Sequence, residues 1–251
     1  MDEVFAQGSS PVHRLDPRVK LLGAAIFSVE VALIKDVRVA LLALFLPLLL
    51  INLAGLSWQR VFKRLLVVNA FVLMLWVVLP FSTPGERLLE LGPFCATAQG
   101  VMKALTITVK SNAILLATIA LLGTSSIFEL VHGLRHLRVP DKLVQLFFFC
   151  FRYIHVLEEE SGRLHKAMKV RGFEPSNDLH TLRSYAYLVG QLLLRGYDRS
   201  ERVHKAMLCR GFDGRFWLLE HFVMKGKDAV AFLGMLSWCT FLALLQWGRM
   251  W

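Results

Sequence analysis

Two histidines one helical turn apart are the first residues in this sequence whose spacing could support chemistry. His132 and His136 are four residues apart, so on a helix they share one face. Together they offer two ligands to a metal ion, whereas a zinc site needs three or four, and no third ligand lies near them in the sequence. We therefore interpret the pair as part of an ordinary interfacial helix and expect no metal site.

Three consecutive carboxylates, Glu158 to Glu160, are the other candidates for acid–base chemistry. Arginines and lysines lie near them in the sequence, so a solvated face that neutralises those charges is the simpler interpretation. Histidine in general titrates near neutral pH, but His165 and His204 recur at equivalent positions of a repeat, which favours a shared binding role over one active centre. We expect no catalytic residue and no enzyme; a membrane-embedded, metal-dependent enzyme is the less favoured alternative.

Nucleotides and structural metals also lack a recognisable site in the sequence. It contains no GxxxxGK[ST] phosphate-binding loop, so energy from ATP has to enter through another subunit. The four cysteines indicate neither a zinc site nor a disulfide framework, because no two of them form a CxxC pair. They are Cys95, Cys150, Cys209 and Cys239. We expect no cofactor bound by this chain.

The elements that carry these residues are typical of a membrane protein. Hydrophobic residues make up 55% of the chain and its mean hydropathy is +0.52, and a helix needs about 20 apolar residues to cross a bilayer. Five runs come close: Leu21 to Ile34 with Glu30 inside it, Val39 to Leu56, Leu65 to Phe81, Ser111 to Phe128, and Ala229 to Trp247. The sequence therefore predicts an all-α polytopic membrane protein with about five transmembrane helices and long cytoplasmic helices.

The formal net charge of +10 is spread beside the apolar runs. Basic residues precede the first run, separate the second from the third and crowd between the fourth and fifth, which predicts a cytoplasmic N-terminus in the cell inner membrane. Residues 129–228 hold seventeen Lys and Arg against twelve Asp and Glu, and this interleaving disfavours nucleic acid or a lipid surface as the partner. We expect N-terminal transmembrane helices in 1–128, a cytoplasmic region in 129–228 and a C-terminal transmembrane helix in 229–251.

A thirteen-residue repeat inside the cytoplasmic region is the most informative pattern. Ser161–Phe173 (SGRLHKAMKVRGF) matches Ser200–Phe212 (SERVHKAMLCRGF) at nine of thirteen positions. Proline and Asn-Asp signals precede the two copies and an Arg-Gly pair closes each, so we predict one long helix over about 140–172 and another over about 178–211.

Helix capping explains only part of this repeat. A basic residue followed by glycine is favourable at a helix C-terminus, which accounts for the Arg-Gly pairs. Capping does not account for identical side chains two turns earlier, so we interpret the copies as two equivalent docking elements whose arginines fork onto carboxylates of a partner. The predicted docking residues are Arg171, Gly172, Arg210 and Gly211, completed by Arg163, Arg202, Ala167 and Ala206.

These residues resemble the transmembrane (T) component of energy-coupling factor transporters, specifically the cobalt/nickel branch. The resemblance rests on HRLDPRVKLL at His13–Leu22, on Arg152-Tyr153 ahead of Glu158 to Glu160, and on the two Arg-Gly-Phe helix ends. It covers nearly the whole chain, and the paired motif with its spacing is highly specific. The family's helix end is usually Ala-Arg-Gly, whereas this chain has Val170 and Cys209 in place of the alanine.

The resemblance implies an energy-coupling membrane subunit of an ATP-driven importer, carrying cobalt or nickel ions. In that family the Arg-Gly ends of long coupling helices sit in grooves on two ABC ATPase subunits, and the same component holds a separate substrate-binding membrane (S) subunit. ATP and Mg²⁺ would then be bound by the partner ATPases. The T component of a vitamin transporter is the alternative.

Overall fold

The computed structural model describes residues 8, 10–84, 87–91, 94–137, 139–214 and 226–248. The chain divides into two compact units, Met1–Leu137 with Phe222–Trp251, which we call the membrane unit, and Arg138–His221, which we call the coupling unit. The boundary predicted after residue 128 falls inside helix α6 (Ile127–His136). Because α6 packs against the first helix of the chain, the membrane unit extends to the end of α6.

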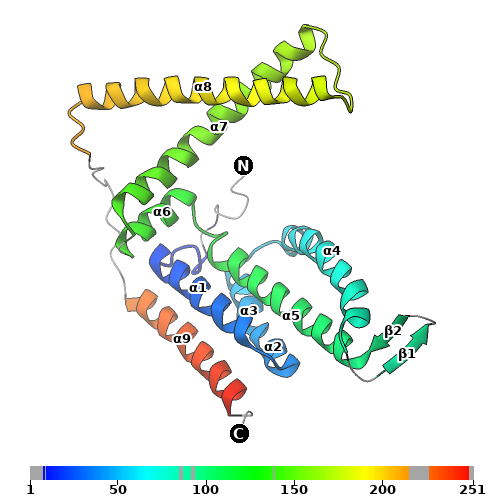
Figure 1. Cartoon of the computed structure of the whole chain (residues 1–251). Coiled ribbons are helices and arrows are strands. Elements are labelled where there is room, and N and C mark those ends of the chain that lie inside the picture. The colour runs from blue at the N-terminus through cyan, green and yellow to red at the C-terminus, as the bar shows by residue number, and fades with distance from the viewer. Residues whose placement is uncertain are drawn as a thin grey trace. The chain divides into compact units, whose positions relative to one another are not determined.

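The membrane unit is built around one central helix. Its elements are α1 (Pro17–Leu33), α2 (Val37–Ala43), α3 (Phe45–Ala54), α4 (Trp58–Ser82), β1 (Arg87–Leu91), β2 (Phe94–Thr97), α5 (Ala98–Leu121), α6 and α9 (Gly226–Trp247). Helix α5 packs against α1, α2, α3 and α4 (Figure 1). Ala113, Ala117 and Ala120 of α5 are at most 1% exposed, and such small side chains let membrane helices approach closely.

Four helical segments among the described residues are long and apolar enough to cross a membrane, namely Val37–Ala54, α4, α5 and α9. They confirm the prediction of an all-α polytopic membrane protein. A short β-hairpin, β1 with β2, lies between α4 and α5. The first of the five predicted spans corresponds to α1, which has only 17 residues and contains Glu30. At 1.5 Å per residue it is short for a span, and it is not among these four segments.

The predicted frame of the fourth span is wrong at both ends, since the predicted last residue, Phe128, lies beyond Leu121, where α5 ends. Helix α5 begins at Ala98, thirteen residues before the predicted Ser111. The prediction relied on an uncharged run, but Lys103 and Lys110 lie within the helix. Lys110 reaches past the apolar surface and its Nζ donates to the carbonyl of Ala32 at 3.1 Å, which shows how a long basic side chain can be accommodated in such a helix.

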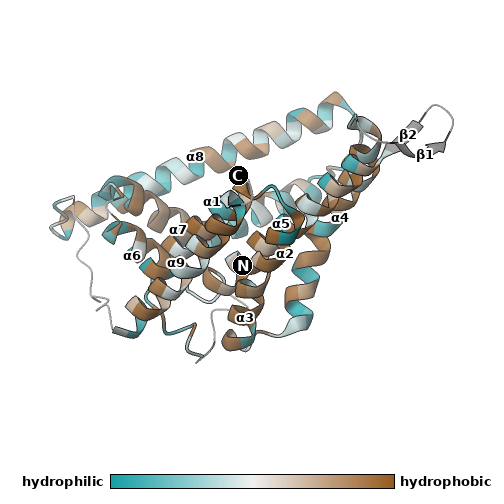
Figure 2. Ribbon diagram, turned by 90° about the horizontal axis from the view of Figure 1, so that it is seen from below, coloured by the Kyte–Doolittle hydropathy of each residue, from teal (hydrophilic) through white to brown (hydrophobic). Residues whose placement is uncertain are grey.

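The coupling unit consists of two long helices, α7 (Asp141–Val170) and α8 (Leu179–Cys209), which pack against each other. Their bounds confirm the two helices predicted over about 140–172 and 178–211. Figure 2 shows hydrophilic residues recurring along α8, whereas α3, α4 and α5 are mostly hydrophobic. An amphipathic helix pair of this kind presents a polar face to water or to a partner.

Candidate docking site

The first repeat ends in a hydrogen-bonded cap at the end of α7. The N–H of Gly172 donates to the carbonyl of Lys169 at 3.0 Å, and the N–H of Phe173 donates to the carbonyl of Met168 at 3.1 Å. This pair of bonds is a Schellman motif, which satisfies carbonyls that a helix end otherwise leaves unpaired. Gly172 has a φ of 80°, in the left-handed region that favours glycine.

The second repeat ends α8 in the same way. The N–H of Gly211 donates to Leu208 at 3.0 Å and that of Phe212 donates to Met207 at 3.1 Å. Gly211 has a φ of 79°. The two ends therefore share one local geometry, and both helix ends predicted from the repeat are confirmed.

The structure leaves the predicted docking faces open. Arg163, Ala167 and Arg171 are spaced by four, which places them along one face of α7, and Arg202, Ala206 and Arg210 do the same on α8. All eight predicted docking residues are exposed. A Cβ added at Gly172 or Gly211 would meet nothing within 4 Å, so within the described structure nothing covers either cap closely.

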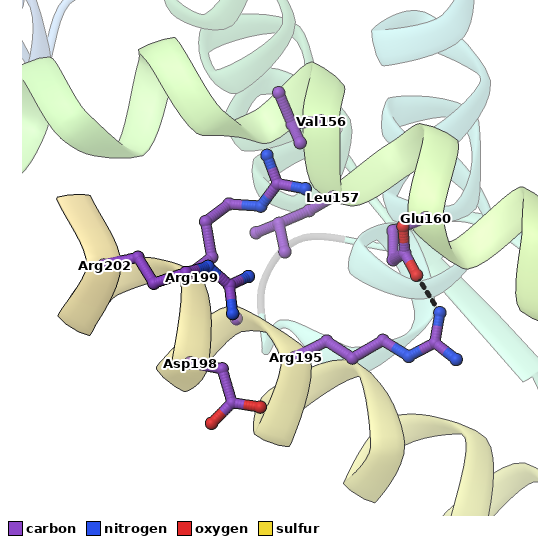
Figure 3. Close-up of a pocket in the computed structure, with 8 residues that line it drawn as sticks. Val156, Leu157, Glu160, Arg195, Asp198, Arg199 and Arg202 are labelled. Carbon is purple, nitrogen blue, oxygen red and sulfur yellow. Dashed lines mark hydrogen bonds and ion pairs between the residues drawn. The ribbon is translucent and has the colours of Figure 1, made fainter.

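Helices α7 and α8 cross where Leu157 meets Gly196, whose missing Cβ would lie 3.8 Å from the leucine Cδ2. Glu160, only 9% exposed, accepts from Arg195 across the crossing (Figure 3). Arg163 Nη2 lies 2.5 Å from the other carboxyl oxygen of Glu160. The hydrogen bond from Arg195, with the positive charge of Arg163, holds the pKa of Glu160 below its usual value. The ion pairs therefore persist at neutral pH and weaken only as the pH falls through that lowered pKa.

The crossing lies at equivalent positions of the two helices. Leu157 and Gly196 are 39 residues apart, the same offset that relates the two copies of the repeat. Gly172 and Gly211 each follow the crossing by fifteen residues, or about 22 Å of helix. The two Arg-Gly ends therefore extend equally far from the point at which the helices are joined.

Two cavities adjoin this crossing. The first, of about 270 Å³, has the charged lining residues Glu160, Arg195, Asp198, Arg199 and Arg202 (Figure 3). The second, of about 400 Å³, is largely apolar and is lined by side chains that include Phe149, Tyr153, Val203, His204 and Met207. Arg202 thus lies beside the crossing as well as on the predicted docking face of α8.

The Arg-Gly-Phe sequence is the same at the two ends, but their neighbouring side chains differ. At the end of α7, the ring of Tyr185 on α8 stacks on His165 with centroids 6.4 Å apart and meets Phe173 edge-on at 5.6 Å. His204, the counterpart of His165, is exposed and lines the apolar cavity. Past the end of α8, Gln145 Nε2 donates to the carbonyl of Gly214 at 3.1 Å.

The residues considered for metal or acid–base chemistry are not gathered into one site. The rings of His132 and His136 lie 5.1 Å apart on α6, in the membrane unit. Glu158 and Glu160 lie on α7, in the coupling unit, where Glu158 lies 3.7 Å from His155. Across the part of the chain that the structure describes, no three His, Cys, Asp or Glu side chains are grouped so that they could hold a metal ion.

Sequence reasoning missed the residues that join the two helices, Arg195, Gly196 and Tyr185. The 39-residue offset of the repeat contained a signal for Gly196, because shifting Leu157 by 39 positions gives Gly196. A small residue opposite a large one at equivalent positions is what two helices need in order to approach closely. Tyr185 carried no such signal, because its partners lie 12 and 20 residues earlier on another helix.

Comparison with known proteins gives consistent matches over this architecture. The model of a family described as cobalt transport protein matches residues 8–218. The energy-coupling factor transporter transmembrane protein EcfT of Heliobacterium modesticaldum is 31% identical over 232 residues, which cover 87% of this chain and 87% of the relative. The proteins of the same name from Acidaminococcus fermentans and Bacillus subtilis are 29% and 26% identical over 96% or more of both chains.

Fold and site together define a polytopic membrane protein with a separate pair of long helices whose matched ends are open to a partner. The chain belongs to the cobalt transport protein family and is a transmembrane component of an energy-coupling factor transporter. This family is a transporter component and not an enzyme.

Proposed function

We propose that this chain is the energy-coupling subunit of an ATP-driven importer, and that its two Arg-Gly ends each dock on one ABC ATPase subunit. The observation that carries the proposal is the pair of identical caps, both exposed and both fifteen residues beyond the crossing. Two like ends at equal distance suit a partner with two like surfaces. Arg171 and Arg210 are the leading contacts, because a guanidinium forms directional, bidentate bonds with a carboxylate.

The coupling mechanism depends on the two long helices, α7 and α8, and on the crossing that holds them together. ATP and Mg²⁺ bind the partner ATPases, whose closure moves the ends of α7 and α8 relative to each other. The helices are 30 and 31 residues long and are held together at the crossing by Glu160 and Arg195. They carry the motion to the membrane helices and from there to a separate substrate-binding membrane subunit.

The cargo we propose is cobalt or nickel ions, on the support of the description of the matching family. The EcfT relatives carry no cargo in their names, so a vitamin is the alternative to test. We also propose that the protein lies in the cell inner membrane with a cytoplasmic N-terminus, which the placement of basic residues supports.

Affinity purification from mild detergent tests the partners. The tagged chain should bring down two ATPase subunits and a small membrane subunit, and the purified complex should take up Co²⁺ or Ni²⁺ in proteoliposomes only with ATP. Uptake of a vitamin instead would correct the cargo alone. A chain that purifies without ATPases under these conditions would contradict the proposed function.

A cysteine-labelling experiment tests the orientation. A cysteine placed near Ser176 in an otherwise cysteine-free chain should react with an impermeant reagent only after the cells are opened. Reaction in intact cells would reverse the orientation.

A further inference from the structure

The coupling unit is inserted into the membrane unit at two points of the chain. The chain leaves the membrane unit after α6 and returns to it before α9. Motion of α7 and α8 therefore reaches the membrane helices along the chain through the end of α6 and the start of α9. Any residue that holds these two ends in place controls how much of that motion is transmitted.

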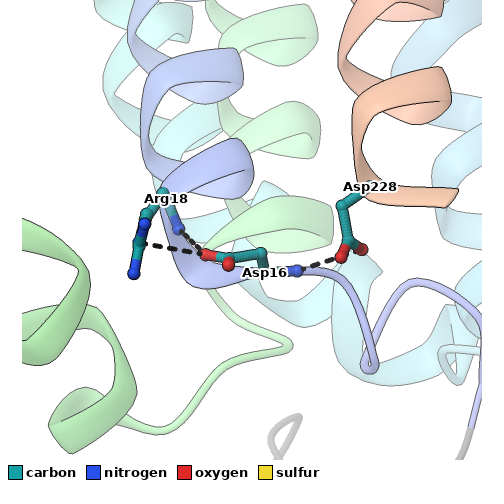
Figure 4. A network of polar contacts seen from close by, with 3 residues as sticks. All are labelled: Asp16, Arg18 and Asp228. Atoms are coloured by element: carbon teal, nitrogen blue, oxygen red, sulfur yellow. Dashed lines mark hydrogen bonds and ion pairs between the residues drawn. The ribbon is translucent and has the colours of Figure 1, made fainter. Parts of the chain in front are cut away.

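The turn that leads into α1 contacts both the last part of α6 and the start of α9. The backbone N–H of Asp16 donates to Asp228 Oδ1, in the first turn of α9, at 3.4 Å (Figure 4). Pro17 packs against Gly133 of α6, where a Cβ would lie 3.3 Å from Pro17 Cβ and 3.1 Å from Leu21 Cδ1. Asp16 and Asp228 are each 5% exposed, so these contacts are made in the protein interior.

A buried lysine, Lys20, also holds this turn in place through hydrogen bonds. Lys20 is fully buried, and its Nζ donates to Ser125 Oγ at 2.7 Å, to the carbonyl of His13 at 3.2 Å and to the carbonyl of Thr124 at 3.3 Å. A buried ammonium is costly unless its donors are satisfied, and here three acceptors from two parts of the chain meet it. Lys20 therefore ties the segment before α1 to the turn between α5 and α6.

The start of α1 is rigid in its own right. Asp16 Oδ1 accepts from the backbone N–H of Arg18 at 2.9 Å, and Pro17 occupies the first helical position, where its fixed φ suits the helix. A capped helix start cannot shift by a residue without losing these bonds. The turn thus acts as a fixed point on which both α6 and α9 rest.

We propose that Asp16, Pro17 and Lys20 form a brace that positions the ends of α6 and α9, so that motion of the coupling unit is transmitted to the membrane helices. These are positioning residues, since they act through the two ends that they hold. The inference rests on the proposed function and adds the residues that make coupling efficient. It gives a role to the HRLDPRVK segment, which lies far in sequence from both Arg-Gly ends.

Replacement of Asp228 tests the brace at the start of α9. Asp228→Asn keeps a carbonyl oxygen that can accept from the Asp16 N–H, whereas Asp228→Leu, of similar size, cannot. We would measure ATP hydrolysis and Co²⁺ uptake of the whole complex in proteoliposomes and compare the ions taken up per ATP. Asp228→Leu should assemble and hydrolyse ATP but lose about tenfold in uptake per ATP, the equivalent of about 1.4 kcal/mol. Asp228→Asn should stay close to the wild type.

Each outcome of this experiment decides between positioning and stability. A merely structural role predicts that assembly, hydrolysis and uptake of Asp228→Leu fall together, which would overturn the brace, as would normal uptake per ATP. If Asp228→Leu does not accumulate, Gly133→Ala decides, because the atoms nearest to its added methyl group belong to Pro17 and Leu21. It should lower uptake per ATP, and an unchanged ratio overturns the proposal. A wild-type complex that couples no ATP hydrolysis to Co²⁺ uptake would instead refute the proposed function.

Discussion

The ends of α7 and α8 carry the same motif and the same cap, yet different surroundings hold them in place. Both glycines adopt a φ near 80°, and the two pairs of capping bonds have the same lengths. Behind the α7 end, Tyr185 packs its ring on His165 and Phe173. On α8, His204 is exposed and lines an apolar cavity of about 400 Å³, together with the rings of Phe149 and Tyr153 from α7.

This difference shows which features of a helix end are determined by the repeat and which are determined by contacts with the rest of the fold. The cap is local, so thirteen matching residues reproduce it twice. The support comes from the other helix, outside the repeat: the position equivalent to Tyr185 on α7 is Leu146, which is 57% exposed. We infer that the docking chemistry is duplicated while the surroundings of the two ends are not.

Removal of both arginines should have the largest effect. If each guanidinium meets an acidic group on one ATPase, loss of one partner of a desolvated pair costs about 2–5 kcal/mol. Arg171→Ala with Arg210→Ala should therefore release the ATPases or abolish ATP-driven uptake while the chain stays in the membrane. Co-purification and uptake in proteoliposomes measure the two effects separately.

The single variants sharpen the comparison between the ends. Equal losses for Arg171→Ala and Arg210→Ala would mean that docking depends on the shared cap and arginine alone. A larger loss at Arg171 would mean that the better-supported end contributes more. Lys169→Ala is a matched control, because it removes an exposed positive charge from the same helix end at a position where the second copy has Leu208. Normal assembly and uptake of the double variant would show that the repeat is only structural.

Replacement of arginine by lysine should have an intermediate effect. Lysine keeps the charge but lacks the planar fork, so Arg171→Lys and Arg210→Lys should recover only part of the affinity for the ATPases. If the arginines serve only the helix dipole, which is worth about 0.3–1 kcal/mol, lysine should replace them fully. Titration of purified ATPase onto the detergent-solubilised variants distinguishes a partial from a full recovery.

Local features of this molecule could be predicted from the sequence, and features that depend on distant contacts could not. The ends of α7 and α8 were predictable because Arg-Gly-Phe sets the cap by itself. The start of α5 was not, because Lys110 lies in the helix and satisfies its ammonium on the carbonyl of Ala32, which is 78 positions away.

In the candidate docking site, too, the local features could be predicted from the sequence and the distant contacts could not. All the exposed docking residues were chosen from the repeat alone, since exposure at a helix end follows from the local pattern. The pairing of Glu160 with Arg195 joins residues 35 positions apart on two helices. The brace at Asp16 depends on Asp228, 212 positions later. No periodicity within one helix could reveal either contact.

Alanine at each capping glycine should have a smaller and equal effect. Gly172→Ala and Gly211→Ala force a side chain into a left-handed conformation at a cost of about 1–2 kcal/mol, and nothing within 4 Å adds a clash. Gly190→Ala within α8 is a matched control that should be neutral or stabilising, because its surroundings are also open and its backbone is helical. Thermal unfolding of the purified chain measures all three. Unequal shifts for the two caps would contradict the identity of their geometry.

Loss of the Tyr185 ring should have the smallest effect and should act on one end only. A ring pair contributes about 0.5–1.5 kcal/mol beyond its buried area, so Tyr185→Ala should loosen the α7 end and leave the α8 end as it is. Hydrogen exchange reports on both ends in one experiment: amides of residues 165–173 should exchange faster and those of 204–212 should not change.

Two further variants identify the cause of that change. Tyr185→Phe keeps the ring, so it should leave the exchange of residues 165–173 unchanged if stacking is responsible. Leu146→Ala alters the equivalent position of α7, which is exposed, and should affect neither end. If Tyr185→Ala accelerates exchange equally at both ends, the ring stabilises the helix pair as a whole, and the two ends are alike in support as well as in sequence. If only residues 165–173 respond, the difference in stiffness is local, and the α7 end is the one that transmits force with less loss.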